Sequence, residues 1–245
     1  MHKRAVIIPD PSLENGLAMM VAAHWLRQIH IDVTVFHDKL FTIGCWFPFQ
    51  RIVPVRNLAD AVGKSDLCIS THTSPPLYTA HPPASVIFTT FYRSKKEKPK
   101  KLAPYDKIFS QKLTQAENVS IAIASLFGSF ETSKNNGIDP PFPSFYRIRK
   151  DRVAIDRALL PYRDEVMQLC NMNHFEPVFL DENDLTGSIQ LLYESMFFVG
   201  LPGGLCHLAA NLSIPTTIVR TKKKIPPLDL PAWHSYTLSE VYILS

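Results

Sequence analysis

The sequence has no long apolar run. The longest, residues 17–26, contains His24 and falls well short of the ~20 apolar residues that a membrane-spanning helix requires. The run near the N-terminus, residues 5–8, is too short for the hydrophobic region of a signal peptide. We therefore expect a protein of the cytoplasm.

Cysteine is scarce, and its four copies lie far apart. Cys45, Cys68, Cys170 and Cys206 show neither the CxxC nor the Cys/His spacing of zinc sites, so no metal site is predicted. Cys68 and Cys206 fall in apolar runs and are expected to be small core residues. All four are expected to be reduced thiols.

Several catalytic motifs are also missing. The sequence has no GxSxG nucleophile elbow, no HExxH zinc motif, no Walker A loop and no GxGxxG fingerprint. The enzyme classes built on those motifs are disfavoured, and no cofactor is predicted.

The charge balance is mildly basic, with a net charge of +4, and much of it lies in two runs, 93–101 and 222–224. Such runs can face phosphates or an anionic membrane surface, or lie in water. They lack the interleaved aromatics and the groove-reading helix of nucleic-acid-binding proteins, so no nucleic acid partner is expected. Two interpretations of the run from Arg93 to Lys101 therefore stay open: peripheral contact with the inner face of a membrane, or a solvated loop.

Short β-type runs alternate with stretches of helical periodicity, without hairpin signals, which predicts an α/β fold with mainly parallel sheets. Residues 146–152 are interpreted as a basic stretch. Glycine, asparagine and proline accumulate in residues 129–143. The predicted organisation is therefore a lobe of residues 1–128, a linker of residues 129–145 and a second lobe of residues 146–245. Strands are expected at 4–8, 32–36, 51–55, 67–70, 85–89, 107–109, 177–180, 197–199 and 216–219, and helices at 17–28, 58–62, 114–127, 161–170, 187–195 and 205–212.

The most informative segment is residues 197–219, in which a strand leads through a glycine-rich turn into a helix of small residues. Gly200, Gly203 and Gly204 are expected to let the backbone approach a ligand closely and to adopt positive φ. We take them as candidate ligand-binding residues. A tight strand–helix turn without a ligand is the alternative.

The helix that follows the turn begins near Leu205. Its first N–H groups have no partner within the helix and carry a partial positive charge, which suits a phosphate. His207 falls in the first turn and could donate to a phosphate oxygen or a sugar hydroxyl. A purely structural histidine is the alternative.

Residues 199–216, V-G-L-P-G-G-L-C-H-L-A-A-N-L-S-I-P-T, resemble the C-terminal signature of glycosyltransferase family nine, the ADP-heptose:lipopolysaccharide heptosyltransferases. That signature reads approximately V-G-N-D-[ST]-G-x-x-H-x-A-A-x-x-x-x-P-[TV]. The strand at 4–8, the helix at 17–28 and R-I-V-P-V at 51–55 also follow the family's order. The positions that agree in register are Val199, Gly200, Gly204, His207, Ala209, Ala210 and Pro215.

The resemblance implies a GT-B-like fold of two Rossmann-like lobes with a cleft between them, the C-terminal lobe being reduced in this shortened, divergent chain. It implies a nucleotide-diphosphate sugar, first of all an ADP-sugar, bound by Gly200, Gly203, Gly204, Leu205 and His207. It further implies transfer of a heptose-like glycosyl group, with inversion, to lipopolysaccharide or another saccharide or lipid-linked acceptor.

The chain departs from the family at its acidic positions. The family's N-terminal G-D, whose carboxylate is the proposed general base, aligns with Glu14 and Asn15, and an amide cannot accept a proton at neutral pH. Glu14 or Asp10 could substitute, or both could be solvated loop residues. Pro202 and Gly203 replace the acidic and hydroxyl residues of the C-terminal signature.

The family's basic K-x-W-P element, which contacts the donor phosphates, is also absent. Arg149, Lys150 and Arg152 could replace its charge, or form a solvated basic face. An active transferase and an inactive relative that serves as a nucleotide-binding scaffold therefore both stay open. An unrelated α/β protein with a chance glycine turn is a third interpretation, and it predicts that His207 is buried in the core.

Overall fold

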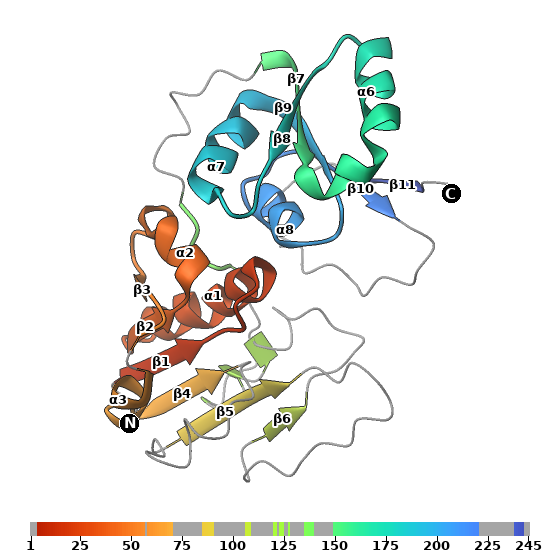
Figure 1. The fold of residues 1–245 in the computed structure, drawn as a ribbon. Helices are drawn as coiled ribbons and strands as arrows, with labels where there is room; N and C mark the ends of the chain where they lie inside the picture. The colour runs from red at the N-terminus through yellow and green to blue at the C-terminus, as the bar shows by residue number, and fades with distance from the viewer. Residues whose placement is uncertain are drawn as a thin grey trace. The chain divides into compact units, whose positions relative to one another are not determined.

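The computed structural model describes residues 4–56, 58–70, 85–90, 106–108, 120–121, 123–124, 127, 135–139, 149–220 and 238–242. The chain divides into two compact units, Met1–Gly137 and Ile138–Ser245, each with one sheet (Figure 1). The division falls within the range expected for the linker. The extent of that linker stays a prediction, because most of residues 129–145 lie outside the described part of the chain.

The first unit contains a sheet of six strands whose described pairings are all parallel, in the order β3-β2-β1-β4-β5-β6. The predicted strands are found within one or two residues of their expected bounds. Pro54 directly follows β3 at the sheet edge, where its missing N–H costs no ladder hydrogen bond. The strands are β1 (Arg4–Ile8), β2 (Asp32–Phe36), β3 (Arg51–Val53), β4 (Leu67–Ser70), β5 (Ser85–Thr90) and β6 (Asp106–Ile108).

The helices of the first unit whose bounds are described are α1 (Leu13–Gln28), α2 (Asp38–Thr42) and α3 (Leu58–Gly63), with a 3-10 turn at Gly44–Trp46. The described residues 120, 121, 123, 124 and 127 of the predicted helix 114–127 are helical as well. α1 begins at Leu13 rather than at residue 17, because the Ser12 side chain accepts the backbone N–H of Asn15 and caps the helix. α2 was not predicted. Its cap is unusual, since the Nδ1 atom of His37 accepts the Leu40 N–H.

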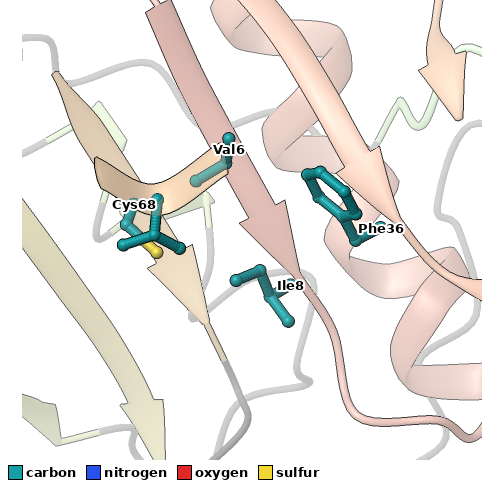
Figure 2. Packing of buried hydrophobic residues seen from close by; sticks show 5 residues of the cluster. Val6, Ile8, Phe36 and Cys68 are labelled. Atoms are coloured by element: carbon teal, nitrogen blue, oxygen red, sulfur yellow. The ribbon is translucent and has the colours of Figure 1, made fainter. Parts of the chain in front are cut away.

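The core between β1, β2, β4 and α3 is formed by apolar side chains from all four elements (Figure 2). Full burial of one such side chain stabilises the fold by about 1.5–3 kcal/mol relative to exposure. Trp46 and Phe47 are buried as well. The cluster consists of Val6, Ile8, Phe36, Val62 and Cys68.

The second unit has a sheet of five strands, also parallel in every described pairing, in the order β11-β10-β9-β7-β8. Two of these strands were not predicted: β7, half of which falls in the stretch interpreted as basic, and β11, in the C-terminal tail. The strands are β7 (Arg149–Asp156), β8 (Glu176–Leu180), β9 (Ser195–Gly200), β10 (Thr216–Arg220) and β11 (Leu238–Tyr242).

The remaining elements of the second unit are a 3-10 segment η2 (Arg157–Tyr162) and the helices α6 (Arg163–Met172), α7 (Leu185–Glu194) and α8 (Gly204–Asn211). Cys206 on α8 is fully buried, as Cys68 is in the first unit, so both are the core residues that the sequence predicted. Among the described helices, none is both long and apolar enough to cross a lipid bilayer. The parallel arrangement brings the ends of β7, β8 and β9 to one edge of the sheet, where α/β proteins place ligands.

Candidate functional site

The glycine turn of the second unit joins the end of β9 to the start of α8. A Cβ atom at Gly200 would collide with the ring of Phe198 and stand 3.1 Å from the Cβ of Asp156. At Gly203 the nearest atom to an added Cβ is the Leu201 carbonyl oxygen, 3.9 Å away. Gly200 is therefore required by packing, whereas the space beside Gly203 is open.

The expectation that these glycines adopt positive φ is wrong. Gly203 has φ −179°, an extended conformation that any residue can adopt. Among the described glycines, Gly137 alone has a positive φ, at 71°. The turn thus needs glycine for close approach of neighbouring atoms and not for left-handed backbone.

The N-terminus of α8 has no side-chain cap. Its N-cap residue is Gly203, which has no side chain to accept the N–H groups of the first turn. At most other described helix starts in this protein, a serine, histidine or aspartate side chain makes that bond. The first turn of α8 therefore keeps backbone donors and a partial positive charge at the sheet edge, the arrangement that binds phosphates in other α/β proteins.

His207 lies at the end of that first turn. Its backbone N–H donates to the Gly203 carbonyl at 3.1 Å, which confirms the predicted position of His207 in the first turn of the helix. Its side chain is only 7% exposed. Burial of this histidine is what a chance glycine turn predicts, so the geometry of His207 alone does not decide between a ligand contact and a structural role.

Asp156, at the end of β7, is a site residue that the sequence analysis missed. Its carboxylate accepts the backbone N–H of Ala158 at 2.9 Å and that of Leu201, and so ties β7 to the glycine turn. Burial raises the pKa of Asp156 above its ordinary range, and the charge of Glu182 raises it further, while the two backbone hydrogen bonds lower it. The available signal was the apolar run 153–155, which ends at this carboxylate.

The edge around the turn is acidic. Asp181, directly after β8, accepts hydrogen bonds from the Arg157 guanidinium at 2.7 Å and the Asn183 N–H at 2.9 Å, which lower the pKa of its carboxyl. Burial raises the pKa of the Cys206 thiol to about 12, so this cysteine is no nucleophile at neutral pH. Asp156 thus brings negative charge near the place where an anionic ligand would bind, whereas the charge of Asp181 is compensated by Arg157.

Arg152 does not supply the missing phosphate contact. Its guanidinium pairs with the carboxylates of Glu194 and Glu176, and its side chain is 12% exposed. In the sheet register Arg152 pairs with Glu176, the first residue of β8, and so lies at the edge opposite the glycine turn. For Arg149 and Lys150, which precede it in β7, replacement of the donor element's charge stays a prediction.

In the first unit, Asp10, Glu14 and Asn15 follow the end of β1, the corresponding edge of that sheet. Asp10 lies in the connecting loop, and its Oδ1 atom accepts the Ser12 N–H at 3.1 Å. Glu14 and Asn15 lie in the first turn of α1 and not in the loop, as Ser12 caps the helix before them. Asp10 and Glu14 are both half-buried.

His37, which the sequence analysis did not single out, fixes this loop. The ring accepts the Leu40 N–H at Nδ1, so its proton is on Nε2, which donates to the Ser12 carbonyl oxygen at 3.1 Å. Burial lowers the pKa of His37 below its ordinary value of 6.5, although hydrogen bonds to the backbone of Ser12 and Asp10 oppose the shift. The neutral ring therefore joins β2 to the start of α1.

The basic runs 93–101 and 222–224 fall outside the described residues. Within the described ranges, no group of three or more His, Cys, Asp or Glu side chains could hold a metal ion.

No protein-family model and no curated protein matches the sequence. Solved structures do match it. The Escherichia coli heptosyltransferase WaaC, solved with ADP, has a TM-score of 0.69 at 15% identity, with 97% of this chain and 93% of WaaC aligned. The E. coli ADP-heptose lipopolysaccharide heptosyltransferase II has a TM-score of 0.65 at 11% identity, over 99% of this chain and 91% of that one.

A family 9 glycosyltransferase from Veillonella parvula gives a TM-score of 0.62 at 13% identity, over 98% of this chain and 86% of its own. Agreement over nearly the whole chain shows that the likeness is one of fold and is not confined to the glycine turn. The resemblance seen in residues 199–216 thus extends to the architecture. The chain has the α/β, GT-B-like fold of the heptosyltransferases.

Proposed function

We propose that the chain is a glycosyltransferase-like protein that binds a nucleotide-diphosphate sugar at the glycine turn between β9 and α8. The observation that carries this proposal is the uncapped N-terminus of α8, in a fold shared with a heptosyltransferase that was solved with ADP. An ADP-sugar with a heptose-like group is the donor we favour. Lipopolysaccharide or another saccharide is the acceptor, and a lipid-linked acceptor would agree with membrane contact from Arg93 to Lys101.

In the proposed reaction, the acceptor hydroxyl oxygen forms a bond to the anomeric carbon of the donor sugar. The bond from that carbon to the diphosphate oxygen breaks, and the nucleoside diphosphate leaves with the electron pair. The hydroxyl proton passes to Glu14 or Asp10 as general base. The N–H groups of α8, together with His207, stabilise the charge that develops on the diphosphate. Attack opposite the leaving group inverts the anomeric configuration.

An inactive relative that binds the nucleotide as a scaffold is the second candidate. Asn15 and Pro202 stand where the resemblance implies acidic residues. The carboxylate of Asp156 beside the turn also opposes the approach of a diphosphate. These three residues favour a protein that keeps the fold but has lost transfer activity.

Calorimetric titration with ADP, UDP and GDP tests the donor site. We expect ADP to bind, and His207→Ala to weaken binding at least tenfold. His207→Gln keeps a polar group in a similar volume, so it provides a second test of His207 if the alanine variant does not fold. His174→Asn is the matched control, because His174 is an exposed histidine of the same unit, and asparagine tolerates its positive φ of 56°. If none of the three nucleotides binds at millimolar concentration, the proposed donor site is wrong.

Release of ADP from ADP-heptose in the presence of an acceptor tests the transfer. Replacement of the general base should reduce turnover by about 10²–10⁴-fold. Glu14→Gln and Asp10→Asn identify which carboxylate acts, and Asp60→Asn is the control, since Asp60 is exposed and pairs with Lys64. If ADP binds but neither the wild-type protein nor any variant releases ADP from ADP-heptose, the scaffold proposal replaces the transferase proposal.

A further inference from the structure

An open pocket of about 590 Å³ lies in the first unit, lined by residues from the end of α1 and the start of β2. Its volume is in the range of small-molecule sites. β2 begins at Asp32, so the pocket lies at the amino ends of the strands. Asp10 and Glu14 follow the carboxyl end of β1, and the pocket is therefore separate from the proposed transfer site.

Gln50 lines this pocket and has an unusual side chain. Both its Nε2 and Oε1 atoms are buried, and neither has a hydrogen-bond partner within the part of the chain that the structure describes. Buried amides are almost always paired, since leaving them unpaired costs stability. The backbone N–H of Gln50 donates to the Phe47 carbonyl at 2.9 Å, which fixes the residue in place. An unpaired amide in a residue that lines a pocket can gain hydrogen bonds from a polar ligand.

The other polar groups in the wall are mixed in kind and balanced in charge. The Arg27 guanidinium and the Asp32 carboxylate are 3.9 Å apart, too far for a hydrogen bond, so their donors and acceptors face solvent. The Gln28 amide lies 2.9 Å from His24 Nε2, which accepts its N–H, and burial lowers the pKa of His24, so that ring is neutral. A purely anionic ligand would face Asp32, and a purely cationic one would face Arg27.

Phe49 adds a large apolar surface beside these groups, since it lines the pocket and is 66% exposed. A sugar ring has C–H faces that stack on an aromatic ring, whose face is electron-rich, and hydroxyls that both donate and accept. From this combination, we propose that the pocket binds a saccharide, as a second carbohydrate site that is independent of the nucleotide site in the other unit.

The full-length protein can be tested by saturation-transfer NMR and calorimetry. The probes are maltotriose, the core oligosaccharide released from lipopolysaccharide by mild acid, and inorganic phosphate. We expect at least one saccharide to bind. Phe49→Ala and Gln50→Leu should each weaken it at least tenfold, whereas Phe41→Ala should not. Phe41 is the matched control, a 51% exposed phenylalanine that does not line the pocket.

Gln50→Leu carries a second expectation that a structural role would not meet. Because the amide has no partner, its replacement by leucine should leave the melting temperature unchanged or raise it while it removes binding. The proposal is overturned if no saccharide binds at millimolar concentration, if phosphate alone binds, or if Phe49→Ala and Gln50→Leu bind the saccharide as tightly as the wild-type protein. His207→Ala should leave saccharide binding intact, which separates this outcome from failure of the nucleotide site.

Discussion

A Cβ atom on Gly16 would stand 2.8 Å from the Nε2 atom of His37 and 3.0 Å from the Leu40 side chain. The imidazole cannot easily retreat, because both of its nitrogens are engaged in hydrogen bonds. Glycine at the end of the first turn of α1 therefore allows the contact between His37 and the loop that carries Asp10.

Gly16→Ala should therefore destabilise the protein by about 1–3 kcal/mol, the usual cost of overpacking. Urea unfolding measures the effect. Gly44→Ala is the control, because an added Cβ at Gly44 meets nothing within 4 Å. If the two variants have equal free energies of unfolding, the His37 side chain moves aside without a loss of stability.

The buried His37 should make stability fall in mild acid. Its pKa is lower in the folded protein than in the unfolded chain, so the unfolded chain takes up the proton first. The stabilisation is complete above the ordinary value of 6.5 and is lost as the pH falls below it, towards the folded pKa. The lowered pKa of His24 acts in the same direction.

Unfolding free energies at pH 7.5 and about pH 5 measure this dependence. In His37→Asn, which can still cap α2, the difference between the two pH values should shrink, and His24 remains present in both proteins. An unchanged difference would assign the acid sensitivity to other groups.

Gly200→Ala should cost about 1–3 kcal/mol, since the added Cβ collides with Phe198. The matched Gly203→Ala should change stability by less than about 0.5 kcal/mol, because its surroundings are open. Thermal or urea unfolding of both variants measures this contrast. A large loss in Gly203→Ala would contradict the open space found beside that residue.

Asp156→Asn should strengthen binding of ADP if the donor site is the glycine turn. The variant removes a negative charge beside the turn and keeps an oxygen that accepts the Leu201 N–H. A gain of up to tenfold corresponds to about 1.4 kcal/mol. Calorimetry at neutral pH measures it. Because burial raises the pKa of Asp156, the wild-type protein should approach the affinity of the variant as the pH falls, and weaker binding by the variant would contradict the electrostatic argument.

The sequence predicted those strands whose apolar runs are self-evident, such as β1 and β4. It did not predict β7, because the strand begins with charged residues. Arg152 is accommodated there by Glu176 and Glu194, which lie 24 and 42 residues further along the chain, and such long-range pairs are not visible in a local window.

The candidate sites show the same division. The position of His207 followed from local pattern alone, and so did the turn before α8. Asp156 and His37 could not be found that way, because their importance comes from the backbone groups of Leu201 and Ser12 that the fold brings to them. The start of α1 was misplaced because the capping serine lies between prolines and acidic residues that are typical of a loop.

The strand order of the second sheet has a consequence for biosynthesis. β7, the first strand of this unit to be made, lies inside the sheet between β8 and β9, and β11, the last, lies at the edge beyond β10. A growing chain can therefore pair β8, β7, β9 and β10 before β11 has left the ribosome. Until β11 pairs with it, β10 offers an unpaired edge to any neighbouring strand, so aggregation of the folding protein can start at this edge.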